Sequence, residues 1–352
     1  MTQFIGRFTD PRLLEFTTGA DRNPLVPGGE GIRAAGLPGE GEAENMSGEI
    51  EIIYGSLWPT AHFGHHVARS FGERLAELTD GRIRVKVTPP TSDKQLVSAL
   101  IKGEIQMSSG HAIQTEVPEL GLSYLPYLYK TFDHFKRIWT LGQSPVSDSL
   151  IRHFERRKVP ARVLGYSLIG FRDMILRDRQ LTQSGGLKGL RVRVDGSDTS
   201  IATFKAIGST PVTIEYHQVQ QALRNGEVDA AENTTYNLIY MDWYKECRHV
   251  TLTEHIALLN VELINLDFWQ RLDSRDRERI EECMALAVRD FNEISAIRRD
   301  TAVGTLKKKG LQVNKIQTEE LERKVLRMKE EFVKEYRLTA EYEHILSTAP
   351  SP

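Results

Sequence analysis

The stretch GLKGLRVRVDGSDTSIATFKAIGSTPVTIEYHQVQQALRNGEVDAAEN, from Gly186 to Asn233, alternates short apolar runs with helical patterns. The pattern predicts strands over residues 190–194, 212–214 and 228–231, and helices over residues 197–207 and 216–225. Gly208 and Gly226 follow the two helices, where glycine can adopt the left-handed conformation that ends a helix. Strands that alternate with helices indicate a mainly parallel α/β sheet.

The same order of elements occurs earlier in the chain. Strands are predicted over residues 50–54, 83–87 and 105–109, and helices over residues 62–79 and 93–102. The segment QLVSALIKGEIQM (Gln95 to Met107) also matches QVQQALRNGEVDA (Gln218 to Ala230) at Gln, Ala, Leu, Gly and Glu. Chance or common turn chemistry could produce one such match. Together with the repeated order of elements, it favours two similar lobes.

The sequence after Asn260 has a mostly helical pattern. Asp273 is a good N-cap, and an apolar stripe follows it with few breaks as far as Gly310. The stripe consists of Ile280, Met284, Ala287, Phe291 and Ile294. A helix of this length can bridge two lobes. A second amphipathic helix is predicted over residues 319–336.

Residues 1–48 differ in composition from the rest of the chain. Gly, Pro and acidic residues are dense from Thr17 to Gly48, which predicts a disordered tail. A secretory signal would need an apolar stretch of about 7–15 residues. Charged residues such as Arg7 and Asp10 interrupt the first 14 residues, so this text shows no export signal.

Bulk composition excludes several classes of protein. The 352 residues suffice for two domains, and the net charge of -2 offers no basic surface for nucleic acid or anionic lipid. Cys247 and Cys283 make neither a disulfide framework nor a zinc knuckle. The chain contains no GxSxG elbow, Walker loop, HExxH or dinucleotide fingerprint. We therefore expect no enzyme, no cofactor and no nucleic-acid partner.

Two arginines and one asparagine are candidates for binding an anion. Arg172 follows Gly170 between apolar segments, and Arg193 lies in a predicted strand on the same side as Arg191. A strand-end arginine can offer its planar fork to a carboxylate. From the residues alone, a solvated face or a surface ion pair is the favoured alternative. Asn233 is either a turn residue or a ligand-contacting amide.

Four histidines are candidates for a metal site. His62 and His66 are four residues apart and would share one face of a helix. His65 lies between them, and His111 follows further along the chain. No carboxylate or cysteine accompanies them at ligand spacing, so we favour polar residues at a helix start or cleft and predict no metal.

These segments together resemble a known family. The block from Gly186 to Asn233 resembles the signature of TRAP-type solute-binding proteins, the dicarboxylate-receptor (DctP) family. DGRIRVKV, VPELGLSYLPYLYKTFDH, GFRDM and YKECRHVTLTEHIALLNVELINLDFWQRLDSRDRERI follow the family's order, and the resemblance covers about Glu49 to Tyr336. It implies a type II periplasmic-binding-protein-like fold, with two α/β lobes, a central cleft and a long bridging helix. Lobe I would comprise residues 49–169 and 259–298, and lobe II residues 170–258 and 299–340.

The resemblance also implies roles for particular residues. The main carboxylate-clamping arginine falls on Arg193, a supporting arginine on Arg172, and the ligand-contacting amide on Asn233. The other implied cleft residues are Tyr216, Trp58, His62 and His111. A metal-binding branch of the family carries Trp after the Glu, whereas this chain carries Asn233, which argues against a metal.

The implied function is that of a receptor. It would bind a small organic acid anion by hinge closure and deliver it to the membrane permease subunits of a TRAP-type secondary transporter. The resemblance implies that the receptor is a monomer and that it works in the periplasm, although the chain shows no signal peptide. One alternative is a cytoplasmic carboxylate sensor or scavenger on the same fold, and another is a metal-dependent hydrolase that uses the histidines. The departures from the family at Pro89, Pro90, Gln218 and Gln220 leave the substrate class open.

Overall fold

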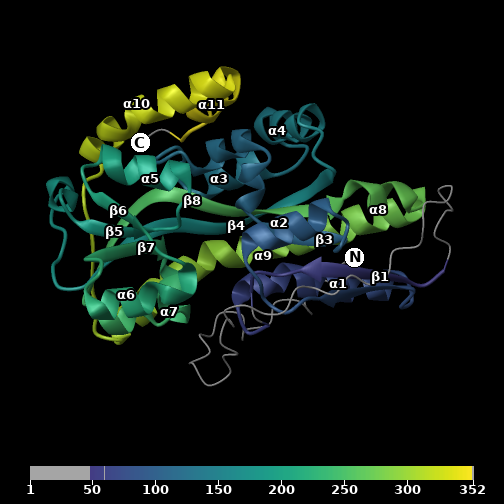
Figure 1. Ribbon diagram of the computed structural model, residues 1–352, viewed down its shortest axis with the longest axis horizontal. Helices are drawn as coiled ribbons and strands as arrows, with labels where there is room; N and C mark the ends of the chain where they lie inside the picture. Colours follow the sequence, from purple (N-terminus) through teal and green to yellow (C-terminus); the bar gives the residue numbers. More distant parts are fainter. Residues whose placement is uncertain (1–47, 59, 351–352) are drawn as a thin grey trace. The chain divides into compact units, whose positions relative to one another are not determined.

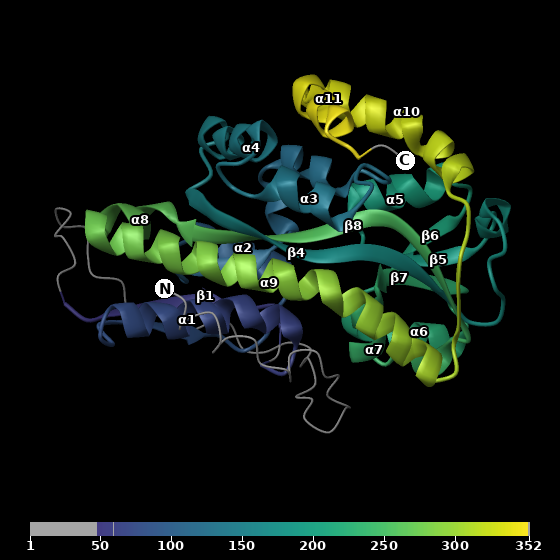
Figure 2. The same cartoon turned by 180° about the vertical axis from the view of Figure 1, so that it is seen from behind.

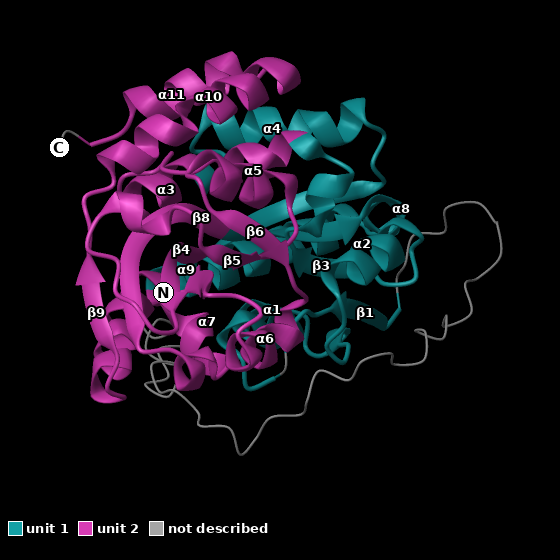
Figure 3. Ribbon diagram, turned by 60° about the vertical axis from the view of Figure 1, so that its left-hand side comes forward, with its two compact units in different colours: residues 1–118, 139–168, 259–293 teal, residues 119–138, 169–258, 294–352 magenta. Residues whose placement is uncertain are grey.

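The computed structural model describes residues 48–58 and 60–350, drawn in Figure 1 and seen from behind in Figure 2. The predicted tail, apart from Gly48, lies outside the described residues. The chain forms two compact units, coloured separately in Figure 3. Unit 1 contains residues up to 118, 139–168 and 259–293, and unit 2 contains residues 119–138, 169–258 and 294 onward.

Unit 1 is built on three short strands. Strand β1 (Ile50–Gly55) pairs in parallel with β2 (Ile83–Val87) and with β3 (Met107–Gly110). The predicted helices are confirmed as α1 (His66–Leu78) and α2 (Asp93–Ile101). Its further helices are η4 (Phe63–His65), η5 (Ala112–Thr115), α4 (Pro145–Arg156) and α8 (Leu266–Arg271).

Unit 2 repeats this arrangement. Strand β5 (Arg191–Val194) pairs in parallel with β6 (Thr210–Thr213) and with β7 (Ala230–Thr234). Helices α5 (Asp198–Ala206) and α6 (Val219–Asn225) connect them, as predicted. Its further elements are η6 (Pro118–Tyr124, which begins in unit 1), α3 (Phe132–Trp139, which ends in unit 1), η7 (Ser184–Leu187), η8 (Tyr216–Gln218), α7 (Thr235–Tyr240), η9 (Trp243–Glu246), β9 (Gln312–Lys315), α10 (Glu319–Tyr336) and α11 (Thr339–Ser347).

Three long elements run from one unit into the other. They are β4 (Ala161–Leu176), β8 (His249–Asn265) and α9 (Ser274–Lys308). The long helix α9 is confirmed, and the Asp273 side chain accepts a hydrogen bond from the Asp276 N–H at 2.7 Å at its start. Strands β4 and β8 pair antiparallel with β7 and β3, respectively, so the sheet is more mixed than predicted.

The sheet of unit 2 has two differently covered faces. Helices α5 and α10 lie over one face, and α6, α7 and the end of α9 lie over the other (Figures 1 and 2). The α5/α10 face holds a core of Met174, Leu176, Val192, Val194, Phe204, Ala230, Leu321 and Val325. Because side chains alternate along a strand, the intervening residues of β4, β5 and β7 point to the α6/α7 face.

Residues 119–138 depart from the predicted lobes. They were expected in lobe I but belong to unit 2. The reason is apolar contact: Tyr127 packs in the core of unit 2 with Met174, and its backbone N–H donates to the His255 carbonyl at 2.9 Å. Unit 2 also continues past residue 340 through α11.

The strand boundaries near the candidate residues differ from the sequence pattern. The strand predicted over 228–231 is observed as β7 and begins two residues later. Asn233 therefore lies inside a strand rather than in a turn. Within residues 48–58 and 60–350, no helix combines the length and apolar character required to cross a bilayer.

Candidate functional site

Arg193 of β5 is a buried cation with unused donors. Its residue surface is 3% exposed, and its Nε–H donates to the Ile214 carbonyl at 2.9 Å. Across the described part of the chain, no acceptor is hydrogen-bonded to its two terminal nitrogens. Burial lowers the pKa of Arg193, while Asp195 and Glu232 oppose that shift. A guanidinium stays protonated nonetheless, so the side chain offers a charged two-nitrogen fork.

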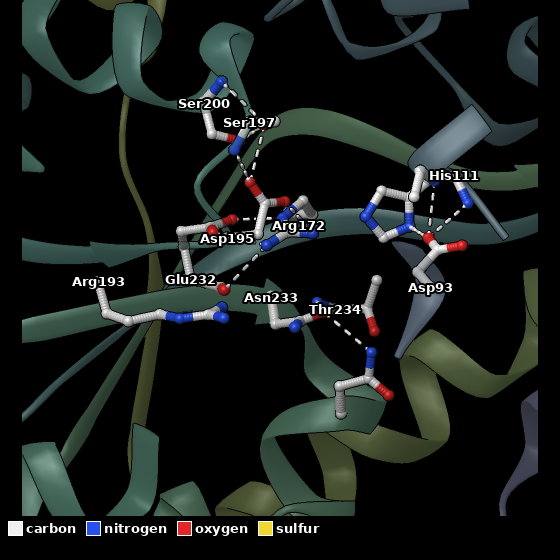
Figure 4. A network of polar contacts seen from close by, with 12 residues as sticks. Asp93, His111, Arg172, Arg193, Asp195, Ser197, Ser200, Glu232, Asn233 and Thr234 are labelled. Atoms are coloured by element: carbon white, nitrogen blue, oxygen red, sulfur yellow. Dashed lines mark hydrogen bonds and ion pairs between the residues drawn. The ribbon is translucent and has the colours of Figure 1, made fainter. Parts of the chain in front are cut away.

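Asn233 supplies another donor on the same face. Strand register places Arg193 beside Ala231, and Asn233 follows two residues later on β7. Its Oδ1 accepts from the Thr234 N–H at 2.8 Å and from the Asn237 amide at 2.9 Å. The Nδ2 amino group is thereby left without an acceptor among the described residues. Figure 4 shows the Arg193 guanidinium directed toward Asn233. Three donor nitrogens of this kind suit the oxygens of a carboxylate.

Arg172 occupies the opposite face of the sheet. Its position on β4 pairs with Thr234, so it shares the α5/α10 face with Glu232. Its Nη2 lies 2.6 Å from Glu232 Oε1, its Nε contacts Glu232 Oε2, and its Nη1 is 3.5 Å from Asp195 Oδ2 (Figure 4). Burial lowers the pKa of Arg172, but these carboxylates outweigh burial and raise it above the usual value. The fork of Arg172 is occupied within the protein.

The sequence-based alternative of a solvated face is therefore wrong for both arginines. Arg172 is 2% exposed and Arg193 3% exposed. Arg191 alone fits that description, because it is exposed and pairs with Asp229 at 2.7 Å. Arg191 and Arg193 share one side of β5, yet only Arg193 is buried there, with its guanidinium over the Trp243 ring.

Glu232 joins Arg172 to a histidine that the sequence pattern did not single out. Glu232 is completely buried, and its Oε2 lies 3.3 Å from His255 Nε2. Burial raises the pKa of Glu232, but Arg172 and His255 outweigh burial and hold it below the usual value. His255 Nδ1 is 2.8 Å from Thr253 Oγ1, and its ring meets Phe204 edge-on. The result is a continuous polar network inside unit 2.

Tyr216 contributes an aromatic wall near Arg193. Its ring packs edge-to-face on Trp243, with centroids 5.6 Å apart. Trp243 is fully buried, and the Arg193 guanidinium carbon lies 5.6 Å from the Trp243 ring centroid. Burial raises the pKa of Tyr216. Tyr216 therefore lies close to Arg193, as predicted. Trp243, which contacts both, was not predicted, because the sequence around it carries no motif.

Trp58 and His62 stack on each other in unit 1. Their ring centroids are 4.0 Å apart at an interplanar angle of 9°. His62 Nδ1 accepts from the Gly64 N–H at 2.9 Å, so His62 caps η4, in agreement with the prediction of a helix-start residue. The described residues hold no group of three or more His, Cys, Asp or Glu arranged for a metal ion.

His111 is held by a carboxylate that sequence reasoning missed. Asp93 Oδ2 accepts from the backbone N–H groups of His111 at 2.9 Å and Ala112 at 2.7 Å. It also lies 3.1 Å from His111 Nδ1 (Figure 4). A Cβ on Gly110 would lie 2.0 Å from Asp93 Oδ1, so a larger residue there would push the Asp93 carboxylate away from these hydrogen bonds. Cleft-lining roles for Trp58, His62 and His111 stay predictions.

Comparison with known proteins connects this geometry to one family. The family model DctP, described as bacterial extracellular solute-binding protein, family 7, matches residues 54–337. The chain is 26% identical over 249 residues to the C4-dicarboxylate-binding periplasmic protein DctP of Rhodobacter capsulatus, covering 69% of this chain and 73% of that protein. It is 24% identical over 227 residues to the sialic acid-binding periplasmic protein SiaP of Vibrio cholerae, covering 62% and 68%.

Solved structures show the same fold. A TRAP periplasmic solute-binding protein from Ochrobactrum anthropi matches with a TM-score of 0.78 and 25% identity, over 87% of this chain and 96% of that chain. A second, from Bradyrhizobium in complex with α/β-D-galacturonate, matches with a TM-score of 0.77 and 21% identity, over 85% and 100%. The type II periplasmic-binding-protein-like fold predicted from the sequence is confirmed.

Proposed function

The chain belongs to family 7 of the bacterial extracellular solute-binding proteins, and on this premise we propose that it binds a small organic carboxylate through Arg193 and Asn233. The proposal extends to delivery of that acid to the permease subunits of a TRAP-type transporter in the periplasm. The protein would act by binding alone, as a monomer, and return its ligand chemically unchanged.

The observation that carries the proposal is the pair of unused donors on one sheet face. A buried guanidinium with two uncommitted nitrogens is costly in the absence of an anion. Asn233 adds a donor whose direction is fixed by Thr234 and Asn237. A carboxylate accepts two parallel hydrogen bonds from a guanidinium and retains lone pairs for an amide N–H. The known relatives that bind C4-dicarboxylate and sialic acid support the same class of ligand.

Arg172 has a different proposed role. Because Glu232 and Asp195 engage its fork, we propose that it supports the binding face from behind rather than contacting the ligand first. Tyr216 would contribute a wall beside the carboxylate. Trp58, His62 and His111 would contact the remainder of the ligand when the lobes close, as the family resemblance predicts.

A thermal-shift panel of organic acids tests the proposal. D-Glucuronate, D-galacturonate, succinate and sialic acid are the first members, with further keto, hydroxy and aromatic acids. A ligand that binds only the folded state adds about 2.7 kcal/mol to the free energy of unfolding at a hundredfold excess over Kd. This added stability raises the melting temperature. The matching methyl esters serve as controls and should give no shift. A panel in which no acid stabilises the protein would reject the proposal.

Asn233→Ala is expected to weaken binding without unfolding the protein. The substitution removes one donor to a charged group, worth about 1.5–3 kcal/mol, so Kd should rise roughly tenfold to a hundredfold. Isothermal titration with the best acid of the panel measures the change. Asn225→Ala, on the exposed end of α6, is the matched control. Equal affinity for the Asn233 variant and the parent protein would remove Asn233 from the site.

A further inference from the structure

The polar network of unit 2 contains equal numbers of fixed positive and negative charges. Arg172 and Arg193 are the cations, and Asp195 and Glu232 are the anions, so their formal charges sum to zero (Figure 4). The four groups influence one another, because Asp195 and Glu232 raise the pKa of Arg193 while Arg172 lowers it. A bound carboxylate would add one uncompensated negative charge to this buried cluster, which low polarity makes costly.

One group in the network can supply a positive charge to balance that of a bound carboxylate. The guanidiniums cannot gain a proton, and the carboxylate of Glu232 already accepts from Arg172 through both oxygens. His255 is 3% exposed, and its Nε2 faces Glu232 Oε2 at 3.3 Å. Histidine is the side chain whose charge changes most readily near neutral pH.

The second ring nitrogen of His255 has a partner that suits both protonation states. Nδ1 lies 2.8 Å from Thr253 Oγ1, and a hydroxyl can either donate to a bare nitrogen or accept from a protonated one. Rotation of one hydroxyl hydrogen therefore accommodates the imidazole and the imidazolium. Nε2 keeps its hydrogen toward Glu232 in both forms. No heavy atom has to move when the charge changes.

We propose that binding of a carboxylate at Arg193 is coupled to the uptake of one proton by the imidazole of His255, an inference that rests on the proposed function above. The proton goes to Nδ1 and is donated to Thr253 Oγ1, while Nε2–H stays directed at Glu232. The imidazolium restores neutrality to the cluster after the anion enters. Binding then delivers an acid and a proton together.

Other charged groups surround His255 and limit where the proton can go. From β4, Asp173 is fully buried and lies 3.5 Å from Arg299 Nη2 of α9, with its Oδ1 accepting from the Glu254 N–H at 3.0 Å. Burial raises the pKa of Asp173, and Arg299 opposes that shift. Asp173 is the competing proton acceptor. On β8, the carboxylate of Glu254 pairs with Arg299 and with Lys315. Arg172 of β4, Phe204 of α5 and Tyr127 of the segment before α3 also lie near His255, and none of these three gains a proton near neutral pH.

The sign of the pH dependence follows from linkage. Because one proton is taken up with the ligand, affinity is greater at low pH and falls as the pH rises. For one proton, Kd rises at most about tenfold for each pH unit. A ligand held without proton uptake would show no such slope.

Isothermal titration in several buffers tests the coupling. The best acid of the thermal-shift panel is titrated at pH 7 into full-length protein in phosphate, HEPES and Tris, which differ in ionisation enthalpy. The observed enthalpy plotted against buffer enthalpy has a slope equal to the protons taken up, and we expect a positive slope approaching one. His255→Gln keeps an amide N–H for Glu232 and cannot take up a proton, so its slope should fall to zero. Circular dichroism verifies that this variant is folded.

Asp173→Asn separates the two proton acceptors. If His255 takes up the proton, the slope persists in Asp173→Asn and disappears in His255→Gln. The reverse pattern, or a zero slope for the parent protein with binding intact, overturns the coupling and leaves the proposed function standing. Failure of every acid in the panel to bind overturns the proposed function, and the coupling with it. If His255→Gln unfolds, the ¹⁵N shifts of His255 in the parent protein, with and without the acid, decide the question.

Discussion

Replacement of Arg172 by methionine is expected to lower the free energy of unfolding by about 3–5 kcal/mol. The variant leaves Glu232, which is completely buried, with His255 as its remaining ionic contact. A buried carboxylate that loses its bidentate partner must either stay charged in a poor environment or take up a proton. Urea denaturation followed by tryptophan fluorescence at pH 7 measures the loss.

The pH dependence of this loss has a definite sign. In the parent protein the pKa of Glu232 is held below its usual value, so its contribution to stability is present at neutral pH and is lost as the pH falls. Without Arg172 that contribution is absent. The stability difference between the two proteins should therefore shrink as the pH is lowered through the depressed pKa of Glu232, below the value of about 4.3 at which an ordinary glutamate takes up a proton.

Two control variants test whether the loss of stability comes from the buried ion pair. Arg327→Met removes an arginine from a fully exposed pair with Glu331 on α10 and should leave the urea midpoint unchanged. Arg172→Met combined with Glu232→Leu removes both charges and should recover most of the lost stability. If Arg172→Met is as stable as Arg327→Met, the network is not the structural support that its geometry indicates.

Replacement of Arg193 by alanine is expected to weaken carboxylate binding by roughly a hundredfold to a few thousandfold, on the order of 3–5 kcal/mol. The ligand carboxylate would then enter a buried site without its cation. Lysine should restore only part of the affinity, because its ammonium offers charge without the planar two-nitrogen fork. Isothermal titration with the best acid of the panel measures both variants.

Arg191→Ala is the matched control for Arg193→Ala. Arg191 lies two residues earlier on the same side of β5, but it is exposed and paired with Asp229. Its removal should leave affinity unchanged. Circular dichroism verifies that Arg193→Ala is folded, because the substitution also removes the hydrogen bond to the Ile214 carbonyl and the contact with the Trp243 ring. Near-normal affinity for Arg193→Ala would exclude the carboxylate clamp.

The elements that could be predicted from the sequence are those specified by neighbouring residues. The long helix α9 follows from one apolar stripe and the Asp273 cap, and α10 was predicted with the observed bounds. Gly226 has the positive φ of 74° that its place after α6 requires. Each of these signals lies within a few residues of the element that it specifies.

The long strands β4 and β8 could not be predicted in this way. They span 16 and 17 residues, and most of their side chains are buried on both faces of the sheet. Such strands lack the alternation of apolar and polar residues on which strand prediction depends. Pairing with distant segments decides their conformation, and that information is not local.

The features of the candidate site also differ in whether a local sequence signal predicts them. Arg193 and Asn233 could be proposed because each lies at a recognisable place in the block from Gly186 to Asn233. The engagement of Arg172 by Glu232, 60 residues away, has no local signal. The same is true of Trp243 beneath Arg193. Sequence reasoning identified these donors, and only the fold shows which of them are already engaged.

The orientation of the Asn233 amide limits which ligands the proposed site can accept. Thr234 and Asn237 hold that oxygen, so the amide shows its NH₂ side beside the guanidinium of Arg193. A primary carboxamide has nearly the outline of a carboxylate, but its own NH₂ would meet nitrogen–hydrogen groups and find nothing to bond with. An ammonium group would be repelled outright. If the proposed site is correct, the direction of the Asn233 side chain discriminates between an acid and its amide, whatever the volume of the site.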